Sequence, residues 1–286
     1  MSVTGKTSDI ELKISSNWNA FTKAEKKVAS RVMEQFDQVI YHSITDLAEE
    51  AGVGETTVLR FCRKLGFKGY HEFKLAVAAD QVNSVASLHE DIDENDELQG
   101  MVQKITMANQ KALQDTMALI DRDQLAKAID MMLQARKVHF YGVGTSGITA
   151  QDALNRFLRI GFPAEAFTDS HLQAMAAATL TSEDVAVGIT VSGSTKDTVD
   201  VLRIARESGA RTVAITHFAR SPVSQIADVV LLTGGRESPL QGGSLAAKIA
   251  QLHVIDLLFT GIAIRSKERA LYYKEKTAKA VVDKIY

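Results

Sequence analysis

The chain has few of the residues that would place it in a specialised structural class. Its 286 residues include one cysteine, one tryptophan and three prolines. A single cysteine cannot form an internal disulfide or supply a cysteine-rich metal site, so no metal site is predicted. Cys62 stands inside a helical apolar pattern, where we expect a small buried side chain. This cysteine usage is compatible with a reducing cytoplasm.

The sequence also has no large excess of charge of one sign and no long uninterrupted apolar run. Lys and Arg total 33 and Asp and Glu total 35, for a formal net charge of −2, so any nucleic-acid binding must come from a local basic face. The polar segment 1–9 excludes a signal peptide. The apolar run 254–264 is interrupted by Asp256, Thr260 and Gly261, which predicts a buried helix, and no membrane segment is expected.

The first half of the sequence has helical periodicity. Thr22 and Glu25 form a predicted capping box at the start of a helix over residues 22–36. An acidic, weakly apolar stretch over residues 84–97 is typical of a solvated linker. Further helical segments are expected over residues 43–51, 55–65, 72–82 and 98–133.

In the second half, short apolar runs alternate with helical segments. The runs, predicted as strands, cover residues 138–141, 164–167, 185–189, 212–215 and 229–232. The predicted helices cover residues 148–159, 172–180, 196–208, 223–227 and 244–264, and the last is expected to close the domain. This order predicts βαβ units and a parallel sheet covered on both faces. We therefore assign residues 1–82 to a helical domain, 83–110 to a linker or connecting helix, and 111–286 to an α/β domain.

The strongest short pattern is a helix-turn-helix over residues 44–65. Gly52 lies in the tight turn, and Ala48 and Phe61 are among the small or apolar residues that stand where the two helices must touch. Such a unit places its second helix in the major groove of double-stranded DNA, where arginine can bridge a guanine edge with two hydrogen bonds. The alternative is a plain helical hairpin. The candidate DNA contacts on the second helix are Glu55, Thr56, Thr57, Arg60, Arg63 and Lys64.

A glycine-rich loop follows the first predicted strand. Gly142, Gly144 and Gly147 together match the fingerprint of a dinucleotide-binding loop. That fingerprint also requires an acidic residue near the end of the next strand to hold a ribose, and Glu165 and Asp169 are only loosely placed for this. A sensor of nicotinamide dinucleotides is therefore one alternative.

A cluster of hydroxyl groups follows the third predicted strand. Ser192, Ser194 and Thr195 stand just before the helix that starts at Lys196. One hydroxyl would be enough to cap a helix, whereas a phosphate is held by several hydroxyls together with backbone amides at a helix N-terminus. Ser146 in the glycine loop adds another hydroxyl. Because open α/β sheets bind ligands at the C-terminal ends of their strands, the cluster favours a phosphate.

These motifs resemble the RpiR family of sugar-catabolism regulators, in which an RpiR-type helix-turn-helix is fused to a SIS (sugar isomerase) domain. The segment 57–69 is similar to that family's recognition-helix signature, and residues 142–146 and 192–195 resemble the two SIS loops. The segments 169–173 and 248–252 also look familial. The resemblance covers the chain from about residue 19 onward.

The resemblance implies a five-stranded parallel SIS sheet that is sandwiched by helices, binds a phosphosugar and dimerises, with tetramers left open. Gly54 stands where the family commonly has a serine cap, and Thr190 where the SIS loop commonly opens with serine. The candidate phosphosugar-binding residues are Gly144, Thr145, Ser146, Ser192, Gly193, Ser194, Thr195, Glu237 and Ser244.

SIS domains also occur in isomerases, which need a base beside the substrate carbonyl. His171, His217 and Glu237 are the candidate bases. A sensor needs only the binding part of such a site, and the attached helix-turn-helix favours a sensor over an enzyme. We therefore predict a cytoplasmic transcription regulator, without catalysis or a cofactor, whose affinity for double-stranded operator DNA is controlled by a phosphosugar.

Overall fold

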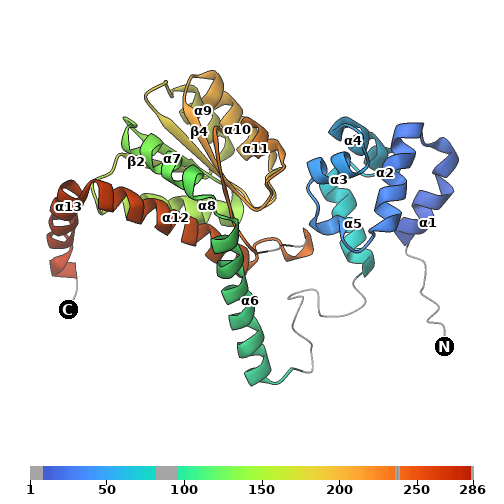
Figure 1. Ribbon diagram of the computed structural model, residues 1–286, viewed down its shortest axis with the longest axis horizontal. Coiled ribbons are helices and arrows are strands. Elements are labelled where there is room, and N and C mark those ends of the chain that lie inside the picture. Colours follow the sequence, from blue (N-terminus) through green and yellow to red (C-terminus); the bar gives the residue numbers. More distant parts are fainter. Residues whose placement is uncertain (1–8, 82–95, 236, 238, 285–286) are drawn as a thin grey trace. The chain divides into compact units, whose positions relative to one another are not determined.

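The computed structural model describes residues 9–81, 96–235, 237 and 239–284. The chain divides into two compact units, one of residues 1–107 with 237–242 and one of residues 108–236 with 243–286 (Figure 1). Residues 83–95 of the predicted linker, which include most of its acidic run, lie outside the described residues.

The first unit is helical, as the sequence predicts. Its described helices include α1 (Asp9–Ser16), α2 (Lys23–Glu34), α3 (Ile44–Glu50), α4 (Glu55–Lys64) and α5 (Tyr70–Gln81), with short 3₁₀ turns η1 (Trp18–Ala20) and η2 (Val39–Tyr41). The predicted capping box is present, because the Thr22 hydroxyl accepts a hydrogen bond from the Glu25 amide and the Glu25 carboxylate accepts one from the Thr22 amide. Helix α1 was not predicted, since its short period is too weak to separate from a polar tail.

Helices α3 and α4 form the expected helix-turn-helix. Gly52 has a φ of +62°, and the Val53 amide donates to the Ala48 carbonyl at 2.9 Å, which closes the C-terminal end of α3. Ala48 is 3% exposed, so the two helices cross closely at this small side chain. Phe61 and the fully buried Cys62 anchor the inner face of α4 in the core of the unit. The apolar pattern thus leaves the opposite face of α4 for solvent or a partner.

The second unit contains a five-stranded parallel sheet with the order β2-β1-β3-β4-β5. Every strand pair runs parallel, and Tyr141 at the end of β1 pairs with Phe167 on β2 and Gly188 on β3. The connections leave β1 and β3 in opposite directions, so the loops that follow these two neighbouring strands flank the point where the strand order reverses. The strands are β1 (Val138–Tyr141), β2 (Ala164–Phe167), β3 (Val185–Ile189), β4 (Arg211–Thr216) and β5 (Val229–Leu232).

Helices cover both faces of the sheet, which confirms that expectation. Side chains that alternate along each strand build two cores, one around Phe140 and one around Tyr141. The first core contains residues of α7 (Arg122–Leu133), α8 (Gly144–Leu158) and α12 (Leu245–Arg265). The second contains residues of α9 (Ser170–Ala178), α10 (Lys196–Glu207) and α11 (Pro222–Ile226).

Two helical predictions need correction. The periodic stretch 98–133 is not continuous: α6 (Leu98–Leu119) ends before Asp121, whose carboxylate caps α7 by accepting from the amides of Asp123 and Gln124. The domain does not close at α12, because α13 (Lys267–Lys279) follows it directly. Length and composition alone would let α12 cross a membrane, but Val254, Leu258 and Ile262 are fully buried in the core of the second unit.

Candidate functional site

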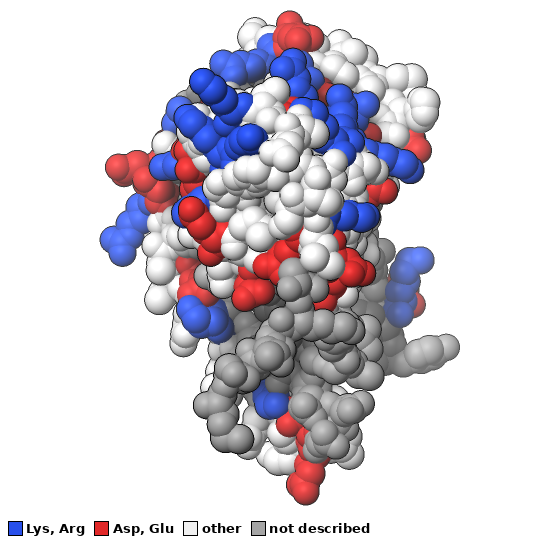
Figure 2. Space-filling model, turned by 90° about the vertical axis from the view of Figure 1, so that its right-hand side faces the viewer, with Lys and Arg blue, Asp and Glu red and all other residues white. Residues whose placement is uncertain are grey.

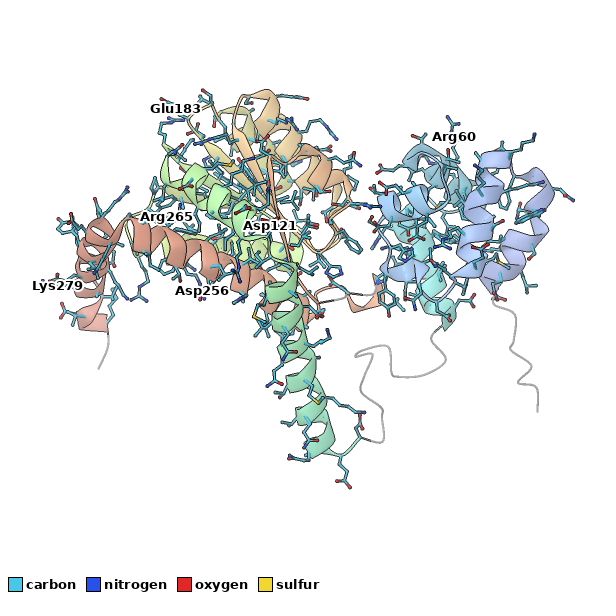
Figure 3. The ribbon with its side chains drawn as sticks, viewed as in Figure 1. Arg60, Asp121, Glu183, Asp256, Arg265 and Lys279 are labelled. Atoms are coloured by element: carbon cyan, nitrogen blue, oxygen red, sulfur yellow. The ribbon has the colours of Figure 1, made fainter. Side chains whose placement is uncertain are left out.

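The outer face of α4 carries the exposed part of the predicted DNA reader. Thr56, Arg60 and Arg63 are exposed, whereas Thr57 is half-buried. Arg60 points outward in Figure 3, and Figure 2 shows Lys and Arg side chains gathered toward the upper part of the first unit. Glu55 accepts a hydrogen bond from the Thr45 hydroxyl at 2.5 Å, which joins the start of α4 to α3.

Lys64, at the end of α4, makes contacts inside the unit. Its ammonium donates to Glu25 Oε2 at 2.6 Å and to the Ala20 carbonyl at 2.7 Å. Burial raises the pKa of the Glu25 carboxyl, but hydrogen bonds from Lys64 and Thr22 outweigh burial and hold that pKa below its ordinary value. This ion pair ties α4 to α2, a role that the charge pattern of α4 alone did not indicate.

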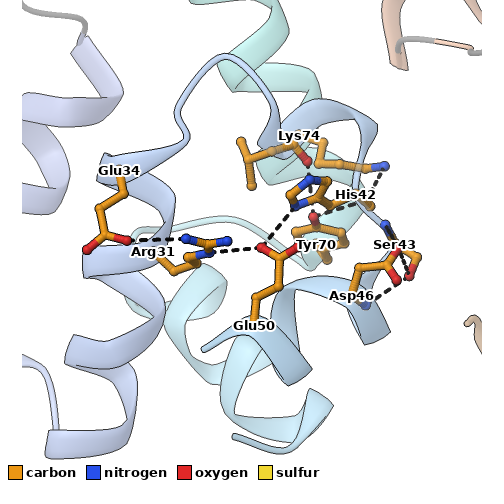
Figure 4. A network of polar contacts seen from close by, with 9 residues as sticks. Arg31, Glu34, His42, Ser43, Asp46, Glu50, Tyr70 and Lys74 are labelled. Atoms are coloured by element: carbon orange, nitrogen blue, oxygen red, sulfur yellow. Dashed lines mark hydrogen bonds and ion pairs between the residues drawn. The ribbon is translucent and has the colours of Figure 1, made fainter. Parts of the chain in front are cut away.

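A polar network supports the helix-turn-helix from the side of α5 (Figure 4). The Tyr70 hydroxyl lies 3.2 Å from the carbonyl oxygens of both Val39 and His42, and the Lys74 ammonium donates to the His42 carbonyl at 3.1 Å. Burial lowers the pKa of Lys74 to about 8, against an opposing attraction from Asp46. The network fixes α5 against the segment that leads into α3.

The loop after β1 is shaped by glycine. A Cβ on Gly142 would lie 2.6 Å from the Ser146 carbonyl oxygen, and Gly144 has a φ of +57°, so the backbone turns tightly into α8. Ser146 is 7% exposed, and its Oγ accepts a hydrogen bond from Gln251 Nε2 at 3.1 Å. A side chain of α12 therefore reaches the first turn of α8.

The loop after β3 brings three hydroxyls together. Thr190 Oγ1 lies 2.9 Å from Thr195 Oγ1, and Ser192 Oγ lies 3.4 Å from the same atom. Gly193 has a φ of +64°, and a Cβ there would lie 2.3 Å from Ser221 Oγ. The Ser194 side chain is exposed. Of the predicted cluster of Ser192, Ser194 and Thr195, the structure joins Ser192 and Thr195 through their side chains, with Thr190 in place of Ser194.

The helices that follow the five strands differ in whether a side chain caps their N-terminus. Side chains cap three of them: Asp169 caps α9, Ser221 caps α11 and Ser244 caps α12. At α8 and α10 the capping positions, Val143 and Thr195, make no side-chain cap hydrogen bond. These two helices follow β1 and β3, so the N-termini without a side-chain cap lie at the reversal of the strand order.

Relatives of the chain identify its class. An HTH-type transcriptional regulator of Haemophilus influenzae is 39% identical over 282 residues, which cover 97% of this chain and 98% of that protein. Residues 8–84 match the helix-turn-helix domain of the rpiR family, and residues 131–261 match the SIS domain. The chain belongs to the rpiR family of transcription regulators.

Two further relatives of this rpiR-family regulator carry names. HexR of Escherichia coli, an HTH-type transcriptional regulator, is 33% identical over 253 residues, which cover 88% of this chain and 87% of HexR. Among solved structures, the Vibrio vulnificus NanR protein complexed with ManNAc-6P has a TM-score of 0.87 at 30% identity, covering 97% of this chain and 100% of that one. The helix-turn-helix and SIS architecture is therefore shared along nearly the whole length.

Sequence reasoning on this regulator did not single out two glutamines at the site. Gln173 donates from Nε2 to the carbonyls of Gly142 and Phe167, both at 2.9 Å, and so joins the ends of β1 and β2. Gln251 joins α12 to α8 through Ser146. Both stand in segments that resemble the family, but a lone glutamine on an apolar helix gives no signal of its partner.

The other residues predicted to bind the phosphosugar lie in different parts of the structure. Ser244 caps α12 by accepting from the Ala247 amide at 3.5 Å, and Thr145 is exposed in the first turn of α8. Glu237 belongs to the segment 237–242 of the first unit, so its role toward the sugar stays a prediction. Within the described residues, no group of three His, Cys, Asp or Glu side chains could hold a metal ion.

Proposed function

We propose that this regulator binds operator DNA through α4 and that a phosphorylated sugar, bound by the loops after β1 and β3, controls its DNA affinity. One observation carries the effector half of the proposal. At the reversal of the strand order, α8 and α10 begin without side-chain caps, although hydroxyls stand in both loops. Two adjacent helix N-termini whose amides no side chain caps, with hydroxyls in the loops before them, suit an anion with several oxygen atoms.

The side chains that the two loops contribute are neutral. Ser146, Ser192 and Thr195 can donate hydrogen bonds, and the N-terminal ends of α8 and α10 add favourable partial charge. Hydroxyls and helix N-termini of this kind can hold a phosphate without a buried ion pair. Weak, reversible binding is the expected behaviour for an effector that reports a metabolite level.

The strand order argues against a dinucleotide as effector. The order β2-β1-β3-β4-β5 is that of flavodoxin-like sheets, which bind a mononucleotide phosphate at the β1/β3 reversal, and not the Rossmann order. The acid that a ribose would need is also engaged: Asp169 accepts from the Leu172 amide at 3.0 Å as the cap of α9. Glu165 lies in the middle of β2 and not at its end.

The exposed face of α4 supports DNA reading by Arg60 and Arg63. Both guanidinium groups stand on a helix whose inner face is buried, so they can reach a major groove without rearranging the unit. Thr56, at the start of the helix, is placed for a phosphate contact. Lys64 is already paired with Glu25, so we expect it to contribute less to DNA than the two arginines.

The names of the relatives support a transcription regulator without catalysis. We further propose that it works in the cytoplasm as a dimer. A dimer would present two α4 helices to two half-sites, and an effector that reorients them would change the match to half-site spacing. Of the candidate bases, His217 is held by its ring: Nδ1 lies 2.8 Å from the Thr233 carbonyl, which can only accept, so Nδ1 carries the hydrogen. Turnover of a sugar phosphate that is lost in Glu237→Gln would instead favour an isomerase.

The experiment is a thermal-shift screen with hexose, pentose and amino-sugar phosphates, together with NADH. Because NanR was solved with ManNAc-6P, amino-sugar 6-phosphates lead the panel. We expect one class of sugar phosphate to raise the melting temperature, and Ser192→Ala to abolish that shift. Ser182→Ala is the matched control, because Ser182 is exposed in the turn before β3, at the opposite edge of the sheet. A shift with NADH alone would refute the phosphosugar proposal.

A further inference from the structure

Gln251 of α12 stands directly behind the serine of the first loop. We propose that Gln251 is a positioning residue that turns the Ser146 hydroxyl hydrogen outward, so that this serine donates to the anion. The inference rests on the phosphate site proposed above and assigns a residue that does not itself contact the ligand.

Three buried side chains form the chain of hydrogen bonds. Thr149 Oγ1 donates to Gln251 Oε1 at 3.1 Å, and Gln251 Nε2 donates to Ser146 Oγ at 3.1 Å. Thr149 is fully buried, Gln251 is 1% exposed and Ser146 is 7% exposed. The serine lies 105 residues from the glutamine in sequence, so the contact depends on the packing of α12 against α8.

The direction of these bonds determines what the serine can do. An amide N–H occupies one lone pair of Ser146 Oγ and cannot accept the serine's own hydrogen. Among the described residues, no hydrogen bond in which the Ser146 hydroxyl donates is present. The hydrogen is thus left for an acceptor outside the protein, and an anion offers only acceptors.

Thr149 is the second partner of the Gln251 amide. In the structure its hydroxyl donates to Oε1, which leaves Nε2 directed at Ser146 Oγ. A reversed amide would place its oxygen at Ser146 and take the serine's hydrogen for an internal bond, with Thr149 acting as acceptor instead of donor. The observed orientation is therefore the one in which Ser146 can donate to a ligand.

The test compares binding of two probes, N-acetylmannosamine 6-phosphate and inorganic phosphate, to the full chain by calorimetry. Gln251→Met keeps the length of the side chain but cannot donate, and we expect it to weaken phosphate binding about tenfold. Thr149→Val acts from the other end of the chain of bonds and should weaken binding by a smaller factor. Gln251→Glu should weaken it most at pH 8, where a carboxylate would accept the serine's hydrogen.

The pH profile separates positioning from a merely structural role. Burial raises the pKa of a carboxyl, so at pH 5.5 the introduced acid is protonated and can again donate to Ser146 Oγ. The ratio of variant to wild-type affinity, measured at each pH to cancel the titration of the probe, should return toward one as pH falls. A packing defect would give a ratio that does not depend on pH.

Thr179→Val is the control of the same substitution type. Thr179 is an exposed threonine at the C-terminal end of α9, outside both loops, and its hydroxyl donates to the Ala176 carbonyl at 2.8 Å, so its loss should leave binding unchanged. Two results would overturn the positioning role and leave the phosphate site standing. One is that Gln251→Met binds a probe with the same affinity as the wild type. The other is that the ratio of Gln251→Glu affinity to wild-type affinity does not change with pH. Failure of the wild-type chain to bind either probe would overturn both.

Discussion

Replacing Lys64 by methionine tests whether the last basic residue of α4 serves the fold or the DNA. The change leaves the Glu25 carboxylate, 5% exposed, with the Thr22 amide at 2.7 Å and without its cation. Breaking a buried ion pair by removing one partner costs about 3–5 kcal/mol. Lys64 is 37% exposed and Glu25 keeps its capping bond, so solvent screening reduces the expected loss of unfolding free energy to about 1–2 kcal/mol.

The pH dependence of this loss has a definite sign. The pKa of Glu25 in the folded state lies below the ordinary value of 4.5, so the group stabilises the fold above pH 4.5 and that contribution is lost as pH falls through the lowered pKa. Without Lys64, a main cause of the lowered pKa is lost while the effect of burial remains, so the pKa of Glu25 rises above its wild-type value. The variant should therefore lose stability at a higher pH than the wild type during acid titration.

Trp18 provides the assay, because it is the one tryptophan of the sequence and lies in the first unit. Its fluorescence during urea denaturation reports the unfolding of that unit separately from the SIS unit. Lys64→Met should unfold at lower urea, and Glu25→Gln in the same background should recover part of the loss. Equal midpoints for wild type and Lys64→Met would contradict the structural role.

DNA binding by the same variant gives the complementary result. Each phosphate contact of a cation contributes about −0.9 to the slope of log affinity against log salt concentration. On an operator selected from a random-sequence pool, Lys64→Met should leave this slope unchanged, whereas losing an arginine that contacts phosphate, tested with Arg63→Met, should reduce it by about 0.9. A reduced slope for Lys64→Met would show that DNA displaces Glu25 as its partner.

Three other predictions follow from buried groups. Because burial holds the pKa of Lys74 at about 8, below the unfolded value of 10.5, the wild-type first unit should gain up to about 3 kcal/mol between pH 8 and 10.5, and Lys74→Met should lack that gain in Trp18 fluorescence. Thr198→Val should raise the stability of the SIS unit by about 1 kcal/mol in denaturation followed by circular dichroism. Gly193→Ala should abolish binding of the sugar phosphate in calorimetry, because its Cβ would lie 2.3 Å from Ser221 Oγ.

The elements with long or strongly apolar patterns could be predicted from the sequence. The predicted ranges of the five strands agree with the structure within one residue at every boundary, because short, mostly apolar runs between helical segments mark strands of a covered sheet. The helix-turn-helix was also predicted, from its apolar positions and its turn glycine. Helices α1 and α13 could not be predicted in this way. Each helix buries few residues, Ile10 and Ile14 in α1 and Ala270 in α13. An apolar pattern with so few positions is too short to be recognised in the sequence.

The candidate site shows a different limit. The residue types in its loops were visible in the sequence, because glycine is needed for positive φ and hydroxyls stand before a helix. What those hydroxyls do depends on partners that are distant in sequence and individually unremarkable. Asp169 was a candidate for a ribose contact until the structure placed it on the Leu172 amide. Ser146 could have been an ordinary helix-start residue until Gln251 was found behind it. The direction of a hydrogen bond, which decides whether a serine can donate to an anion, is a property of packed helices, and no local pattern encodes it.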